Sequence, residues 1–358
     1  MRIVAERVAE ANGTVAEHRP ELCARKPGQE LDLRRGTGGF GDHAQRDYPP
    51  RLVASRVIDI AGVPIALEGS DDTRERSLHG SFEGFGPTRA VPAATIAIDA
   101  ATAVAPARPA RSELLHIKFW DEPDGIVVAT PGLVITVRGS RADAHVTDLA
   151  AIADFEGCVY LPLTWLLARH DRFVLHGAGI VRDGRALLLL GQSGAGKSTL
   201  VVAALEAGWQ ALADDVVIVE APATGFRLHG IHRTPAVPTE IGGPLAESAF
   251  RLDDLRNRAA LSRTVLTRGG HALAGVVLIT HADDADGSLR EAAGHQVLPK
   301  LLQSFAGSID PTLRASFFAP AAALSRLPVW ELGHAADPTM RRERAAHHLD
   351  RCADALAL

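Results

Sequence analysis

Cysteine is scarce in this chain of 358 residues, which contains only Cys23, Cys158 and Cys352. The three lie far apart without a CxxC spacing, so we expect neither a disulfide framework nor a zinc knuckle. Long apolar runs are also missing. The longest, around residues 158–168, is much shorter than the roughly 20 residues that span a bilayer, and residues 1–6 contain no signal-peptide core. These absences predict a reduced, cytoplasmic protein with no membrane partner.

An excess of one charge sign is absent as well. The chain has 38 Lys and Arg against 43 Asp and Glu, a net charge of −5 and a pI near 6.3. This balance argues against a general nucleic-acid partner. The composition, 46% hydrophobic and 23% charged, is that of a globular protein with a buried core. The length exceeds the commonest domain size, which favours two domains, or one large domain with extensions.

The N-terminal part of the chain has the pattern of β-strands. Residues 1–50 contain repeated Gly and Pro with few β-branched or aromatic residues, so we expect a flexible or loosely packed leader. Residues 51–153 contain short β-branched runs bounded by Gly and Pro, clearest at 114–120, 126–129 and 133–137. We expect these runs to form an antiparallel β-rich domain, with the polar stretch 69–92 as a loop.

The pattern changes near residue 154, and we expect a second domain over residues 154–358. Residues 185–190 form a largely apolar run, typical of a strand buried on both faces of a sheet. A Gly-rich turn and a helix over 198–207 follow, and later strands are expected at 211–213, 216–219 and 273–279. The helical spacing of Ala345, Leu349, Cys352 and Leu356 predicts a closing amphipathic helix, with His347 and His348 on its surface. The expected fold class is therefore α/β.

The eight residues Gly-Gln-Ser-Gly-Ala-Gly-Lys-Ser at 191–198 fit the P-loop pattern, with the buried strand before and the helix after that the pattern requires. Glycines let the backbone wrap closely around phosphate oxygens, and the helix directs the positive end of its dipole at the same point. Lys197 is expected to reach the β- and γ-phosphates, and the Ser198 hydroxyl to bind Mg²⁺. The predicted nucleotide-binding residues are Gly191, Ser193, Gly194, Ala195, Gly196, Lys197, Ser198 and Thr199.

An acidic pair follows this motif. Asp214 lies seventeen residues after Lys197, just enough for one helix, a turn and a returning strand. In a right-handed βαβ unit the two strand ends lie on the same edge of the sheet, so Asp214 and Asp215 would arrive beside the phosphates. Two adjacent carboxylates repel each other without a cation, which favours a metal ion here. The pair Asp283-Asp284, which follows a later apolar strand, is an alternative.

The succession of His176-Gly177, an apolar strand, the P-loop motif, a helix and Ala213-Asp214-Asp215 resembles the HPr serine kinase/phosphorylase family and its HprK-like relatives. The match covers residues 173–220. The resemblance implies a P-loop core related to that of phosphoenolpyruvate carboxykinases, and ATP with Mg²⁺ as cofactors. Because HPr kinases assemble as hexamers, it also implies a homo-oligomer.

The resemblance also implies roles for individual residues. Asp214 would deprotonate an acceptor serine, and Lys197 would stabilise the transferred phosphoryl group. Asp215 would help Ser198 to hold the metal, and His176 would sit beside the phosphates.

The chain departs from the family in two places. HPr kinases carry a Glu and an Arg before a Gly-rich turn, but the corresponding residues 226–233 contain no Glu, and no counterpart of the later basic loop is evident. Both departures argue against HPr as the substrate and against phosphorolysis. HprK-like relatives also include kinases that modify ribosomal peptides, lasso peptides among them. We therefore expect an ATP-dependent serine kinase acting on a peptide or protein. The alternatives are a kinase for a small-molecule hydroxyl and a nucleotide-binding regulatory module.

Basic residues near the expected substrate side are further candidates. His229, His232 and Arg233 lie where the substrate-side loop would run, either contacting phosphate or acceptor or pointing into solvent. Arg263 and Arg268 bracket a polar segment before the last buried strand and are candidates to close over the nucleotide.

Overall fold

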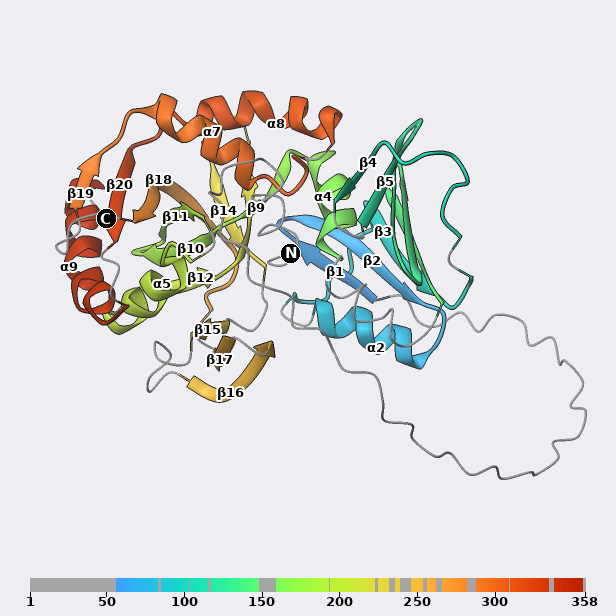
Figure 1. Ribbon diagram of the computed structural model, residues 1–358, viewed down its shortest axis with the longest axis horizontal. Helices are drawn as coiled ribbons and strands as arrows, with labels where there is room; N and C mark the ends of the chain where they lie inside the picture. Colours follow the sequence, from blue (N-terminus) through green and yellow to red (C-terminus); the bar gives the residue numbers. More distant parts are fainter. Residues whose placement is uncertain are drawn as a thin grey trace, which may run out of the picture.

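The structure is a computed structural model of mixed α/β type (Figure 1). It describes residues 56–82, 85–102, 104–114, 117–147, 159–192, 194–222, 225–231, 236–238, 246–253, 256–261, 266–281, 288–308, 310–334 and 338–356. The expected leader therefore lies outside the described residues. So do several predicted site residues, namely Ser193, His232, Arg233, Arg263, Asp283 and Asp284.

The N-terminal sheet has eight strands in the order β1-β2-β3-β8-β7-β6-β5-β4. Their bounds are β1 Arg56–Ile60, β2 Val63–Gly69, β3 Ala94–Asp99, β4 Ser112–Leu114, β5 Ile117–Glu122, β6 Gly125–Thr130, β7 Leu133–Arg138 and β8 Arg141–Val146. Strands β4 to β8 form a meander of antiparallel hairpins, as their β-branched runs and Gly-containing turns predict.

The expectation of an antiparallel sheet is wrong at β3, which runs parallel to both β2 and β8. The reason lies in the stretch 69–92, which is not only loop: it contains helix α2, Asp72–Ser81. Asp71 caps α2 by accepting hydrogen bonds from the amides of Thr73 and Arg74, and Leu78 is buried. A helical crossover of this kind lets the next strand return in the same direction.

The second sheet has nine strands. The main path is β12-β10-β11-β18-β14-β13-β9, with β20 beside β18 and β19 beside β20. The bounds are β9 Arg172–His176, β10 Ala178–Arg182, β11 Arg185–Gly191, β12 Gln210–Ala213, β13 Val216–Glu220, β14 Arg227–Gly230, β18 Gly270–His281, β19 Ser288–Glu291 and β20 Val329–His334. Strands β11, β18 and β20 are parallel neighbours, so their carboxyl ends share one edge. A separate sheet holds β15 Ala236–Pro238, β16 Ala246–Asp253 and β17 Arg256–Leu261.

Helices cover both faces of the nine-stranded sheet (Figure 1). The remaining described helices are α4 Tyr160–Ala168, α5 Lys197–Glu206, α7 Gly294–Ser304, α8 Pro311–Leu324 and α9 Pro338–Leu356. Alternate residues of β11 enter two cores: Leu187 belongs to the core that contains residues of α5 and α9, and Leu188 belongs to the core that contains residues of α7 and α8. None of the described helices combines the length and apolar composition needed to cross a bilayer.

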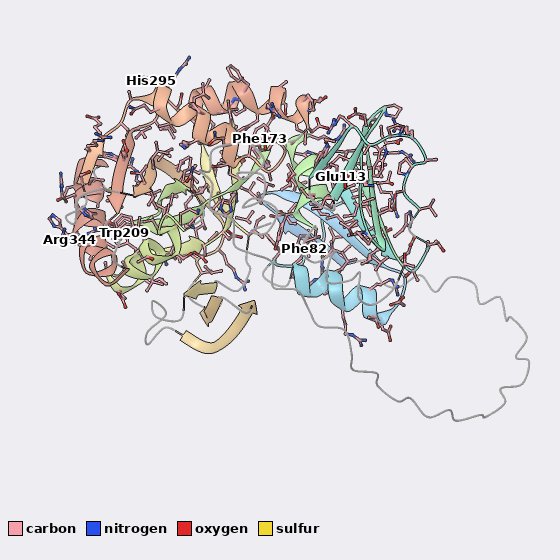
Figure 2. The ribbon with its side chains drawn as sticks, viewed as in Figure 1. Phe82, Glu113, Phe173, Trp209, His295 and Arg344 are labelled. Atoms are coloured by element: carbon pink, nitrogen blue, oxygen red, sulfur yellow. The ribbon has the colours of Figure 1, made fainter. Side chains whose placement is uncertain are left out.

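The core on the α7–α8 side continues into the N-terminal sheet. It contains Ile135 of β7, Leu163 of α4 and Val174 of β9. Helix α4 lies between the two sheets, and Figure 2 shows Phe82 on the N-terminal side and Phe173 on the C-terminal side of this junction. The two sheets are therefore joined by continuous apolar packing.

Candidate functional site

The glycine-rich loop, residues 191–198, connects β11 to α5. Gly196 is the N-cap of α5 with φ 106°, a left-handed conformation that residues with a side chain rarely adopt. Gly191 has a different requirement: a Cβ there would lie 2.7 Å from the carbonyl oxygen of Ile279 on β18. The sequence thus needs glycine at Gly196 for conformation and at Gly191 for close approach of the neighbouring strand.

The mouth of this loop has positive electrostatic character. No side chain caps the N-terminus of α5, and its first turn contains no acidic residue. The first amides of a helix and its dipole therefore present partial positive charge there. Lys197 adds a full charge: its Nζ donates to the carbonyl oxygens of Gly191 (2.8 Å) and Gln192 (3.1 Å), and the residue is only 7% exposed. The side chain lies over its own loop rather than in the core. Ser198 is half-buried and Thr199 is buried.

A histidine and the acidic pair meet at a corner shared by two strand pairs. Strand β9 pairs antiparallel with β13, and β10 pairs antiparallel with β12. The chain passes from β9 to β10 at His176-Gly177 and from β12 to β13 at Asp214-Asp215, and these two connections lie beside each other. The amide of Gly177 donates to the carbonyl of Asp215 (3.1 Å), and His176 Nδ1 lies 3.2 Å from Asp215 Oδ1. The structure therefore brings together residues that lie 38 and 39 positions apart along the chain.

This corner lies on the same sheet edge as the glycine-rich loop. Ala178 of β10 pairs with Leu189 of β11, and Gly179 pairs with Ala213 of β12. Strands β11 and β12 thus run in the same direction with β10 between them, which puts their backbones about 10 Å apart at the usual strand spacing. The carboxyl ends of β11 and β12 deliver Gly191 and Asp214 to one edge. The intervening β10 (Figure 1) is a feature that the sequence did not indicate.

The strand that precedes the alternative acidic pair reaches the loop as well. Ile279 of β18 pairs with Gly191 in parallel register, on the side of β11 opposite to β10. Asp283 and Asp284 follow this strand and lie outside the described residues. The choice between the two pairs stays a prediction.

Glu331 is an acidic residue near this edge that sequence reasoning missed. It lies on β20 opposite Leu278, and Leu278 in turn pairs with Leu190, the residue before the loop. The Glu331 carboxylate contacts Thr280 Oγ1 (3.4 Å) and Arg290 (2.9 Å), and its side chain is 21% exposed. The only signal in the sequence is one Glu inside an otherwise apolar strand.

Of the other basic candidates, His229 and Arg268 belong to the described residues. His229 lies on β14, where its Nε2 contacts Glu220 Oε2 at 2.8 Å. Burial lowers the pKa of His229, while the Glu220 carboxylate partly opposes that shift. His229 pairs with Ile218, which lies three residues along β13 from Asp215, or about 10 Å from the corner along the strand. Of the two alternatives for His229, the solvated loop is wrong, because His229 is a half-buried strand residue whose side chain is 13% exposed. Arg268 is exposed, next to the segment that pairs with Ala211 of β12.

Comparisons with known proteins find matches only among solved structures. No protein-family model matches the sequence, and no curated protein matches it. Among solved structures, the HPr(Ser) kinase/phosphatase from Coxiella burnetii is a weak structural neighbour, with 12% identity and a TM-score of 0.25. The similarity covers 50% of this chain and 97% of that one. A likeness at this level carries no argument about fold or activity, so the site is interpreted from its own residues.

Proposed function

We propose that this protein is an ATP-dependent kinase that transfers a phosphoryl group to a serine hydroxyl of a peptide or protein, with ribosomal precursor peptides of the lasso type as one class of acceptor. One observation carries the proposal. A glycine-rich loop with a buried lysine shares a sheet edge with a histidine and two adjacent carboxylates. Phosphoryl transfer needs this combination, because positive charge must hold the donor phosphates and a carboxylate must accept the proton of the acceptor.

The glycine-rich loop would bind the phosphates of ATP. The amides at the start of α5 and the Lys197 ammonium would stabilise the charge that spreads over the transferred group. Lys197 would exchange its contacts to Gly191 and Gln192 for phosphate oxygens, a small movement because the loop itself holds the side chain in place.

Asp214 would accept the acceptor proton. As the serine oxygen forms its bond to the γ-phosphorus, the bond from that phosphorus to the bridging oxygen breaks, ADP leaves, and the serine proton passes to Asp214. His176 lies against Asp215 and would orient that carboxylate or the γ-phosphate.

Mg²⁺ fits this edge through oxygen donors. The described residues contain no group of three or more His, Cys, Asp or Glu placed to hold a metal ion. Magnesium in kinases usually has only one or two protein ligands and completes its shell with phosphates and water. The Ser198 hydroxyl and the Asp215 carboxylate, whose side chain is 30% exposed, are oxygen ligands of that kind. Bound there, Mg²⁺ would neutralise phosphate charge.

The test is transfer by the full chain. The protein would be incubated with Mg-ATP and serine-containing peptides, including precursor peptides encoded beside its gene, and the products weighed by mass spectrometry. We expect a mass gain of one phosphoryl group on a peptide serine, lost in Lys197→Ala and retained in Lys118→Ala, a control at an exposed lysine of β5. Phosphorylation of a metabolite only would instead indicate a small-molecule kinase. ATP binding with no transfer to any acceptor would indicate a regulatory module. Wild-type turnover by Lys197→Ala would refute the assignment of the loop.

A further inference from the structure

A strap of residues 104–111 crosses the outer face of the N-terminal sheet. Trp120 Nε1 donates to the carbonyl of Arg108 (2.8 Å), and the amide of Arg111 donates to the carbonyl of Phe119 (2.8 Å). A hollow of about 370 Å³ lies between part of the strap and Lys118 and Trp120. Apolar contact between strap and sheet is therefore incomplete, and polar contacts of the strap contribute to its attachment.

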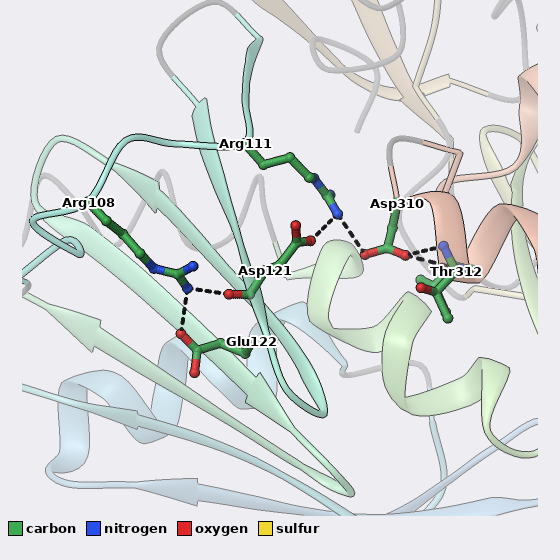
Figure 3. Close-up of polar contacts among 7 residues, drawn as sticks. Arg108, Arg111, Asp121, Glu122, Asp310 and Thr312 are labelled. Atoms are coloured by element: carbon green, nitrogen blue, oxygen red, sulfur yellow. Dashed lines mark hydrogen bonds and ion pairs between the residues drawn. The ribbon is translucent and has the colours of Figure 1, made fainter.

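Two arginines of the strap make different connections (Figure 3). Arg108 bonds to the carbonyl of Asp121 and to the carboxylate of Glu122, both on β5 of the same sheet. Arg111 also contacts Asp121, but its guanidinium reaches Asp310 of the C-terminal part as well, with Nη1 3.4 Å from Oδ2. Asp121, Arg111 and Asp310 together form an ion-pair clasp between the two parts of the chain.

Asp310 of the clasp also caps the N-terminus of helix α8. Its Oδ1 accepts hydrogen bonds from the amides of Thr312 (2.8 Å) and Leu313 (3.0 Å), which makes it the N-cap of α8. The Asp310 side chain is only 7% exposed and that of Arg111 is 23% exposed. A carboxylate buried to this degree is costly without a cation nearby. Removing Arg111 would therefore disturb the start of α8 as well as the clasp.

Helix α8 leads from the clasp to the strand that carries His176. Phe317 of α8 packs against Phe305 (4.5 Å between ring centroids) and Phe173 of β9 (5.0 Å). Phe305 forms a β-bridge with Leu175, and the amide of Ala306 donates to the carbonyl of Val174 (2.9 Å). The segment after α7 thus lies along β9, within three residues of His176.

We infer that the clasp positions β9, and with it His176, from the N-terminal sheet. Arg111 is then a positioning residue that touches no reacting atom. It fixes the start of α8, α8 and Phe305 hold β9, and the end of β9 places His176 against Asp215. This coupling holds whether or not phosphoryl transfer is the reaction of this chain.

Amide hydrogen exchange measured by NMR on the full chain tests the coupling. In Arg111→Met we expect faster exchange at three amides along the route: Arg314, bonded to Asp310; Ala306, bonded to Val174; and Gly177, bonded to Asp215. The increase should be about 1.4-fold to fivefold, the range for loss of a partly exposed ion pair. Arg108→Met, in the same strap but bonded within one sheet, should leave all three rates unchanged. Arg111→Lys should restore protection in part, since it keeps the charge without the guanidinium fork.

Variants of Asp310 provide a second test of the coupling, which can be carried out even if Arg111→Met fails to fold. Asp310→Asn keeps a good N-cap but no charge, so exchange at Ala306 and Gly177 should rise as in Arg111→Met. Asp310→Ala should add faster exchange throughout the first turn of α8. The inference is overturned if Arg314 alone responds while Ala306 and Gly177 exchange as in the wild type, because the clasp would then be only local. Equal effects of Arg108→Met and Arg111→Met would also overturn it, since the strap as a whole would be responsible.

Discussion

Replacing Gly191 by alanine tests whether the glycine-rich loop depends on its contact with β18. The added Cβ would lie 2.7 Å from the carbonyl oxygen of Ile279, 3.2 Å from Ala195 Cβ and 3.3 Å from Ile279 Cβ. The first distance is shorter than side-chain carbons tolerate, and the obstacle is backbone, which cannot rotate away. Gly191 is not among the residues with positive φ, so the clash and not backbone strain is the cause.

The expected cost is that of inserting a methyl group into a packed site, about 1–3 kcal/mol. For a cooperative unit of 150–250 residues each kcal/mol lowers Tm by roughly 2–4 °C, so Tm should fall by roughly 2–12 °C. The strain falls on the loop that would hold phosphate, so the rise in Tm that Mg-ATP produces should shrink as well. The measurement is thermal unfolding by circular dichroism with and without Mg-ATP.

Gly86→Ala is the matched control, because a Cβ at Gly86 meets no atom within 4 Å and its φ is not in the left-handed region. This variant should keep the wild-type Tm and the full effect of Mg-ATP. If Gly191→Ala behaved in the same way as the control, the close approach of Ile279 to the loop would not exist, and the placement of β18 beside β11 would be wrong.

Two further predictions concern nucleotide binding and pH. Lys197→Ala should remove most of the Tm rise that Mg-ATP causes, because the ammonium group at the loop would be lost. Lys118→Ala should retain the rise, and equal responses of the two variants would exclude Lys197 from phosphate binding. Burial, and then the charges of His347, Arg351 and Arg344, lower the pKa of His348 from its ordinary 6.5. As the pH falls below about 6.5, the unfolded chain thus binds more protons at His348 than the folded chain does. The free energy of unfolding therefore decreases as the pH falls from about 6.5 toward the pKa of His348 in the folded state. In melts from pH 7.5 to 5, His348→Gln should reduce this loss, with a remainder from His229. His347→Gln removes only one of the charges that act on His348 and should reduce the loss less; parallel curves for all three proteins would refute the role of His348.

The strongest local signals in the sequence correspond to elements of the structure. The apolar run at 185–190 lies in β11 and the helix expected at 198–207 corresponds to α5. Ala345, Leu349 and Cys352 are buried along α9 as their spacing predicts. Each of these elements is determined by residues near one another in the chain. The expectation that His348 lies at the surface was wrong, because the same helix face that buries Leu349 and Cys352 also covers His348, which is 7% exposed.

Features that depend on distant pairing were not accessible from the sequence. The capping residue Asp71 could have indicated α2, but the polar composition of residues 69–92 concealed the helix. Without that helix, the parallel pairing of β3 with β2 could not be predicted either. The place of β10 between β11 and β12 is determined by tertiary packing, because all three strands are short and apolar enough to pair in several orders. Glu331 approaches the loop edge only through the pairing of β20 with β18.

The central claim is that the carboxylate delivered to the loop edge by β12 is the base for phosphoryl transfer. The most direct measurement is the rate of transfer from Mg-ATP to an acceptor serine in Asp214→Asn, beside Asp283→Asn and Asp284→Asn. Asparagine keeps the size of the side chain but cannot accept the proton, so Asp214→Asn should be slower by about 10²–10⁴ while still binding Mg-ATP. The two later variants should transfer at close to the wild-type rate. Loss of transfer in the later variants, with Asp214→Asn as active as the wild type, would contradict the account and move the base to the end of β18.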